Sequence, residues 1–239
     1  MAVALIYGPA GSGKTTNSTL VKGGYVGIEN GKLKQHPARG KNKLLCSDNS
    51  SIVLSNFDRK NLDIEATWNW LDKDKTGKDQ DCFNKQFRKA IESNAYDTII
   101  VDNVTSIFNN AIIEMDDSGK FKDMRQAYSV IYNGLRRLVW EAAQANTNVI
   151  FNCWHNTEDF TTFEGKMATR ITPKLPMKIM DDFIGMCNIC AYVTTAEKDG
   201  QKVWFYVLEG NPTMYAKDQL YCRKSCMPED IFSGGNKNG

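Results

Sequence analysis

A glycine-rich pattern of eight residues near the start of the chain constrains the fold more than any other feature. Residues 8–15 read GPAGSGKT and match G-x-x-x-x-G-K-[ST] at every fixed position. An apolar run at residues 3–7 precedes the pattern, and residues 15–21 are compatible with a helix. A strand, this loop and a helix together cradle phosphate, because the backbone N–H groups of the loop surround the anion. The sequence therefore predicts an α/β domain that binds a nucleoside phosphate.

Phosphate chemistry assigns a role to each part of this phosphate loop (residues 8–15). Its glycines let the backbone curl around the phosphates, and Lys14 is expected to reach the β- and γ-phosphates. The Thr15 hydroxyl is expected to ligate Mg²⁺, so ATP and Mg²⁺ are the predicted cofactors. The residues expected to bind the nucleotide are Gly8, Pro9, Ala10, Gly11, Ser12, Gly13, Lys14, Thr15 and Thr16.

The remaining sequence alternates predicted strands and helices. Continuous apolar runs predict further strands of a parallel sheet that is buried on both faces; they lie at residues 25–28, 98–101 and 148–153. Apolar residues at helical spacing predict two helices between these strands, within 83–91 and 128–142. Two later runs flank Asp199-Gly200 and predict an antiparallel hairpin.

These elements predict a three-layer α/β fold. We expect a mostly parallel central sheet with a C-terminal antiparallel hairpin. Because no linker-like segment interrupts the pattern, a single domain is expected to span residues 1–232. The small polar residues 233–239 are expected to form a disordered tail.

Composition limits the partners but does not name one. Lys and Arg number 30 against 28 Asp and Glu, so the net charge of +2 indicates no general attraction to nucleic acid. No run approaches the roughly 20 apolar residues that span a bilayer, so no membrane partner and a cytoplasmic location are expected. The spacings Cys187/Cys190 and Cys222/Cys226 suit zinc, but in an extended strand the first pair would face opposite sides, which disfavours zinc.

Two acidic residues are candidates for the chemistry of ATP hydrolysis. Asp102 ends the apolar strand 98–101, as expected for a carboxylate that holds Mg²⁺ through water. Asn103 follows it, where many phosphate-loop ATPases carry a water-activating glutamate, so either the base lies elsewhere or the chain is not a hydrolase. Glu29 ends the strand 25–28 and is expected at the same carboxyl edge of the sheet. The alternative for Glu29 is an exposed acid in a turn.

The strand at 148–153 ends in the polar sequence Asn152-Cys153-Trp154-His155-Asn156. If this strand lies between the strands that end at Gly8 and Asp102, His155 faces the γ-phosphate region. His155 could then sense the nucleotide and pass its state to the segment that follows. The alternative is an ordinary structural histidine.

Four features in this order resemble the RecA-like recombinase core: the phosphate loop, Glu29, Asp102 and the polar strand end at His155. The early start and the late Tyr215-Ala216-Lys217-Asp218-Gln219 make residues 3–220 more specifically similar to phage-encoded RecA-like single-strand-annealing ATPases. The resemblance implies that Glu29 activates water, that residues 157–173 form a mobile DNA-binding loop, and that Lys217 reaches a neighbouring subunit's γ-phosphate. Lys217 as an ordinary solvated lysine is the alternative. At the sensor position the family typically has glutamine, whereas this chain has His155.

The resemblance also implies partners. They are single-stranded DNA, further copies of the chain that share ATP sites, and a single-strand-binding protein, all in the cytoplasm of a phage host. Two cationic stretches could contact DNA, at residues 32–43 and 157–178, and surface loops without a ligand are the alternative. In the second stretch Phe160 and Phe163 accompany cations, which suits stacking with single strands. The cations are Lys166, Arg170, Lys174 and Lys178.

Three functions remain open at this point. The first is a DNA-dependent ATPase in phage recombination or single-strand annealing. The second is a nucleotide or nucleoside kinase, which is disfavoured because the sequence shows no arginine-dense lid. The third is a nucleotide-switched binding module with little hydrolysis, which the missing acid after Asp102 suggests.

Overall fold

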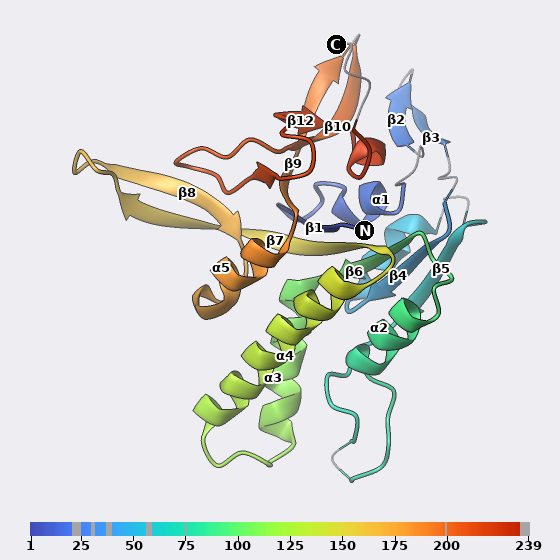
Figure 1. The fold of residues 1–239 in the computed structure, drawn as a ribbon, viewed down its shortest axis with the longest axis vertical. Coiled ribbons are helices and arrows are strands. Elements are labelled where there is room, and N and C mark those ends of the chain that lie inside the picture. Colours follow the sequence, from blue (N-terminus) through green and yellow to red (C-terminus); the bar gives the residue numbers. More distant parts are fainter. Residues whose placement is uncertain are drawn as a thin grey trace.

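A computed structural model of the chain describes residues 1–20, 25–29, 32–36, 40–55, 59–74, 76–198 and 200–234. Figure 1 shows one large twisted sheet with helices on both faces and a separate small sheet beside it. The ten strands of the large sheet are β1 (Val3–Gly8), β4 (Asn42–Cys46), β5 (Leu62–Ala66), β6 (Thr98–Asp102), β7 (Asn148–Thr161), β8 (Met167–Pro173), β9 (Ile189–Lys198), β10 (Gln201–Val207), β11 (Lys217–Asp218) and β12 (Ser225–Cys226). The small sheet pairs β2 (Tyr25–Glu29) with β3 (Lys32–His36).

The centre of the large sheet is parallel. Its main strand order is β12-β10-β9-β1-β7-β6-β4-β5, and the six strands from β9 to β5 run in one direction. The remaining pairings are antiparallel: β10 and β11 each pair with β9, β12 pairs with β10, and β8 pairs with β7. The predicted α/β fold, with a mostly parallel central sheet and a C-terminal antiparallel hairpin, is therefore confirmed.

Helices cover both faces of this sheet. They are α1 (Lys14–Ser18), α2 (Phe83–Glu92), α3 (Val104–Asp117), α4 (Met124–Gln144) and α5 (Met177–Met186), with short 3₁₀ helices η1 (Asn49–Leu54) and η2 (Pro228–Asp230). Alternate β1 residues point to opposite faces, so Leu5 joins the core under α2–α5 and Ile6 joins the core on the α1 side. Among the described residues, no helix has both the length and the apolar character needed to cross a membrane.

The register brings the carboxyl ends of the central strands to one edge. Gly8 of β1 lies opposite Trp154 of β7, and Asp102 of β6 lies opposite Asn152 of β7. β7 therefore lies between the strands that end at the phosphate loop and at Asp102, as the sensor hypothesis for His155 required. Parallel α/β sheets bind ligands at this edge.

The sequence prediction for residues 25–28 is wrong. β2 is not a strand of the parallel sheet but pairs antiparallel with β3, with Glu29 opposite Lys32. The intervening Asn30-Gly31 is the favoured two-residue sequence for a tight hairpin, which explains the local pairing. β4 takes the place beside β6 instead, and its Leu44, Leu45 and Cys46 are fully buried.

The segment expected to form a mobile DNA-binding loop is also different. β7 continues to Thr161 and pairs with β8 as a two-stranded ribbon that projects from the sheet, at the left in Figure 1. The ribbon turns at Gly165, whose positive φ of 75° suits glycine. Thr162 N–H donates to the Lys166 carbonyl at 2.8 Å and closes this turn. The ribbon (residues 155–173) is therefore ordered secondary structure, which holds its side chains in fixed alternation on two faces.

Candidate functional site

The phosphate loop connects β1 directly to α1. Gly11 and Gly13 have φ angles of 73° and 83°, in the left-handed region that favours glycine. Gly13 is the N-cap of α1, so Lys14 is the first helical residue. The local sequence therefore forms the turn that its motif predicts.

Lys14 folds back over this loop. Its Nζ donates to the carbonyl oxygens of Gly8 at 3.0 Å and Pro9 at 2.8 Å, and it contacts Ser12 Oγ at 3.4 Å. The residue is only 7% exposed, and burial lowers the pKa of its ammonium group. Its ammonium group is therefore held at the loop, where phosphate oxygens could replace the carbonyl oxygens as its partners.

Thr15 and Asp102 meet as the sequence predicted. Thr15 Oγ1 donates to Asp102 Oδ2 at 2.5 Å, and Ser50 Oγ donates to the same oxygen at 2.9 Å. Asp102 is 2% exposed, and burial raises the pKa of its carboxyl group. A buried carboxylate with two converging hydroxyl groups is a hard oxygen donor set, so these residues fit Mg²⁺.

Asp48 is a second carboxylate at this edge, which the sequence reasoning missed. It follows β4, the neighbour of β6, and its Oδ1 accepts the N–H of Ser50 at 2.8 Å. Its Oδ2 accepts a hydrogen bond from Asn103 Nδ2 at 2.5 Å. The Asp48 charge also contributes to the raised pKa of Asp102. The signal in the sequence was a short apolar run, residues 44–46, with an acid two residues after it.

Asn103 has a structural part in this arrangement. Its Oδ1 accepts the N–H of Ser106 at 2.7 Å and thereby caps the start of α3. Its amide nitrogen holds Asp48, as described above. Asn103 therefore connects the end of β6 to the acid beside β4. The Glu29 side chain lies outside the described residues, and the sheet position on which its predicted role depended is lost.

His155 lies on β7 next to the phosphate loop. Its ring is 6.3 Å from the ring of Tyr192 at an interplanar angle of 22°. Burial, and then the charge of Lys14, lower its pKa, so the imidazole is neutral at pH 7. Its Nδ1 is buried and has no hydrogen-bond partner among the described residues. This placement is compatible with the predicted sensor role.

Lys217 is not brought to the phosphate loop of its own chain. It lies on β11 opposite Cys190 of β9, and Cys190 lies opposite Leu5, three residues before Gly8. Its Nζ contacts the Gly185 carbonyl at 3.4 Å, at the end of α5. A role of Lys217 at a phosphate therefore requires a second copy of the chain.

Of the four cations predicted by residue to contact nucleic acid, Lys166 and Arg170 lie on the ribbon, Lys174 directly follows it and Lys178 lies on α5. Arg170 lies over the ring of Phe160 at 4.4 Å and near that of Tyr215 at 5.3 Å, and Lys174 lies over Trp154 at 5.6 Å. Lys166, near the ribbon turn, pairs with Glu164 at 2.9 Å. The predicted cations are thus spread along the ribbon and beyond it.

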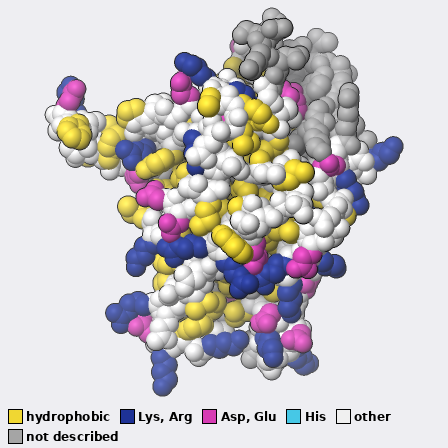
Figure 2. Space-filling view, viewed as in Figure 1, with side chains coloured by type: hydrophobic (Ala, Val, Ile, Leu, Met, Phe, Trp, Pro, Cys, Tyr) yellow, Lys and Arg dark blue, Asp and Glu magenta, His cyan; other side chains and the backbone are white. Residues whose placement is uncertain are grey.

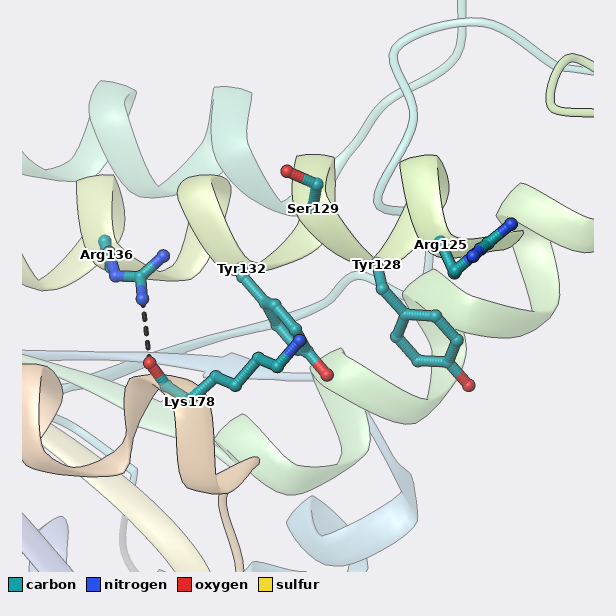
Figure 3. Close-up of a pocket in the computed structure, with 6 residues that line it drawn as sticks. All are labelled: Arg125, Tyr128, Ser129, Tyr132, Arg136 and Lys178. Atoms are coloured by element: carbon teal, nitrogen blue, oxygen red, sulfur yellow. Dashed lines mark hydrogen bonds between the residues drawn. The ribbon is translucent and has the colours of Figure 1, made fainter. Parts of the chain in front are cut away.

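Lys178 belongs to a pocket between α4 and α5 that the sequence reasoning did not identify. The cavity measures about 390 Å³, and Figure 3 shows two tyrosine rings and the Lys178 side chain directed into it. It is lined by Arg125, Tyr128, Ser129, Tyr132, Arg136 and Lys178. Arg136 donates to the Lys178 carbonyl at 2.7 Å and pairs with Asp182 at 2.7 Å, which fixes its guanidinium at the rim.

The surface around this pocket is cationic but mixed. Lys and Arg side chains gather on the lower half of the face in Figure 2, where α4 and α5 lie, with acidic side chains among them. The pocket combines the rings of two tyrosines with arginine and lysine side chains. Such a combination can take an aromatic base and its phosphate together.

A family model and two solved structures are similar to this chain. The family described as an AAA domain matches residues 2–220. No curated protein matches the chain. Among solved structures, a KaiC-like protein from Pyrococcus horikoshii is similar with 12% identity and a TM-score of 0.46, over 86% of this chain and 77% of that one. The flagellar accessory protein FlaH from Methanocaldococcus jannaschii is similar with 11% identity and a TM-score of 0.45, over 94% and 83%.

Proposed function

The chain belongs to the AAA domain family, and we propose that it is a RecA-like ATPase that acts on single-stranded DNA in recombination or strand annealing. The observation that carries the ATPase part is the hydrogen bond between Thr15 and Asp102, which joins the phosphate loop to the acid of β6. The DNA part is supported by the cations that lie over aromatic rings on the ribbon, and by the pocket between α4 and α5.

Nucleotide binding is assigned to the phosphate loop and Asp102. Lys14 exchanges the carbonyl oxygens of Gly8 and Pro9 for phosphate oxygens. Thr15 and Asp102 would hold Mg²⁺, and Mg²⁺ when bound neutralises part of the phosphate charge. The buried setting of Asp102 strengthens these interactions, because the local dielectric is low.

Water activation is assigned to Asp48. Its carboxylate lies at the same sheet edge as Asp102, and bonds to Ser50 and Asn103 fix its orientation. A general base needs a defined position, and Asp48 has one. This assignment takes the role that the resemblance gave to Glu29.

Coupling between nucleotide and DNA is assigned to β7. His155 is close enough to Lys14 for its charge to lower the histidine pKa, and β7 continues from His155 into the ribbon. A movement of His155 on phosphate binding therefore acts on the strand that carries Phe160, opposite the strand that carries Arg170. Lys217 is assigned to a neighbouring subunit's phosphate, so the active form is an oligomer.

The experiment is ATP hydrolysis by the wild-type chain with and without oligo-dT. We expect hydrolysis that rises when oligo-dT is added and that depends on Mg²⁺. Phosphate transfer to a nucleoside would support a kinase instead. Tight ATP binding without turnover, at all oligo-dT concentrations, would support a nucleotide-switched binding module.

A further inference from the structure

A nucleotide at the phosphate loop would have its two ends on different sides of β1. The metal-binding end is fixed by Asp102 on β6 and by Thr15, and the sensor candidate His155 lies on β7. β6 and β7 lie on one side of β1 in the sheet, whereas β9 and β10 lie on the other. A nucleotide whose γ-phosphate is directed toward β6 therefore extends its nucleoside end toward β9 and β10.

One aromatic side chain of β10 reaches the phosphate loop. If Gly13 carried a Cβ, that atom would lie 3.0 Å from Nε1 and 3.2 Å from Cδ1 of Trp204. Trp204 is half-buried and packs on the core on the α1 side. The Nε1 and Cδ1 atoms of its indole therefore lie against the phosphate loop, and part of the side chain is exposed to solvent. A side chain at position 13 would displace it, which adds a second reason for glycine there.

Two polar groups flank this indole. Lys202, two residues earlier on β10, has its Nζ 6.0 Å from the centre of the Trp204 ring. Asn17 on α1 is 3% exposed, and its Nδ2 lies 3.1 Å from the same point beside Gly13. That Nδ2 has no hydrogen-bond partner within the described part of the chain. An aromatic face, a cation and a buried donor without a partner thus meet beside the loop.

We propose that Trp204 is the platform on which the purine base of the nucleotide stacks, with Lys202 close to the ring. The proposal rests on the proposed function, because it requires a nucleotide in the phosphate loop. Stacking is available to every base and is stronger for the larger purine ring system. A face of this kind does not read hydrogen-bonding edges, so ATP and GTP are expected to bind similarly and CTP and UTP more weakly.

The experiment separates the base from the phosphates. Calorimetry would measure ADP and inorganic tripolyphosphate binding to the wild type, Trp204→Ala and Trp204→Phe, each with Mg²⁺. We expect Trp204→Ala to weaken ADP binding about thirtyfold, the middle of the range for one stacked base, and to leave tripolyphosphate binding unchanged. The ADP affinity of Trp204→Phe should lie between those of the wild type and Trp204→Ala. Trp140→Ala removes an exposed tryptophan from α4 and serves as the matched control.

The outcomes differ for the two proposals. Equal weakening of both ligands in Trp204→Ala and Trp204→Phe would mean that the indole supports the loop rather than the base, and would overturn this inference. Unchanged ADP binding in both variants would overturn it as well. A wild type that binds neither ligand would overturn the proposed function itself. Intrinsic fluorescence offers an independent reading, because the change on ADP binding should be lost in Trp204→Phe and kept in Trp140→Ala.

Discussion

The nucleotide edge and the nucleic-acid surface of this chain are built in opposite ways. At the nucleotide edge, Lys14 and Asp102 are buried and are held by several short hydrogen bonds. On the ribbon and at its base, cations lie over aromatic rings at the surface, and the α4–α5 pocket is lined by tyrosines, arginines and a lysine. Buried polar groups are positioned before the ligand arrives, whereas exposed charges depend on solvent and salt. The difference indicates that a few residues are indispensable for nucleotide binding at the edge. It also indicates that many residues each contribute part of the nucleic-acid affinity on the surface.

The largest effect is expected at the buried metal position. Asp102→Asn keeps the size of the side chain but removes its charge, so Mg²⁺-dependent ATP hydrolysis should fall by roughly a thousandfold or more. Oligo-dT binding without nucleotide should be unchanged, as measured by fluorescence anisotropy. Loss of both properties would mean that the two regions are not separate.

A somewhat smaller effect is expected for Asp48. Asp48→Asn retains an acceptor for Ser50 N–H but cannot take a proton, so kcat should fall about 10²–10⁴-fold with little change in KM. Asp63→Asn is the control, because Asp63 is an exposed acid on the neighbouring strand β5. Equal kcat values for Asp48→Asn and the wild type would remove Asp48 from the chemistry.

On the surface, single substitutions are expected to have partial effects. Arg170→Ala removes a cation that lies over Phe160, so oligo-dT affinity should fall about tenfold. The slope of log K against log salt should decrease by about 0.7, the value for one phosphate on a single strand. Arg137→Ala is the control, because Arg137 pairs with Glu141 on α4. An unchanged salt slope would show that Arg170 does not contact phosphate.

In the α4–α5 pocket, we expect stacking on a tyrosine ring to contribute to oligo-dT binding. Tyr132→Ala should weaken oligo-dT binding roughly fivefold, the low end of the range for one stacked base. Tyr132→Phe should retain the wild-type affinity, because the ring remains in the pocket. If the phenylalanine variant binds as weakly as the alanine variant, the hydroxyl group rather than the ring makes the contact.

The smallest effect concerns pH and His155. Its pKa is lowered in the folded chain, so protonation favours the unfolded state and stability is lost as pH falls below the unfolded value of about 6.5. The melting temperature should fall more between pH 7.5 and pH 5.5 in the wild type than in His155→Gln. Equal falls in the two proteins would place His155 in a solvated position.

Features that depend on neighbouring residues in the sequence were predictable. The phosphate loop, the strand that ends at Asp102 and the buried stripe of α4 were all read correctly, because each is fixed by short-range pattern. The position of β7 between β1 and β6 was a condition of the sensor hypothesis for His155, and the strand order meets that condition. These features supply most of the residues assigned to nucleotide binding.

Features that depend on distant pairs were not predictable. The sequence analysis placed residues 25–28 in the parallel sheet and did not identify residues 42–46 as a strand. Only the pairing shows that β4 lies beside β6, which brings in Asp48. The sequence also gives no sign that Glu114 accepts the N–H groups of Trp70 and Leu71 at 2.6 and 2.8 Å. These partners lie 44 and 43 residues apart, beyond any periodic pattern.

The most direct test of the central claim is calorimetric titration of the wild type and Lys14→Ala with ATP and Mg²⁺. We expect the wild type to bind one ATP per chain. In Lys14→Ala we expect binding to be weakened by at least about a hundredfold, since the buried ammonium group is lost. Equal binding by the two proteins, or no heat from the wild type, would contradict the assignment of the phosphate loop as the nucleotide site.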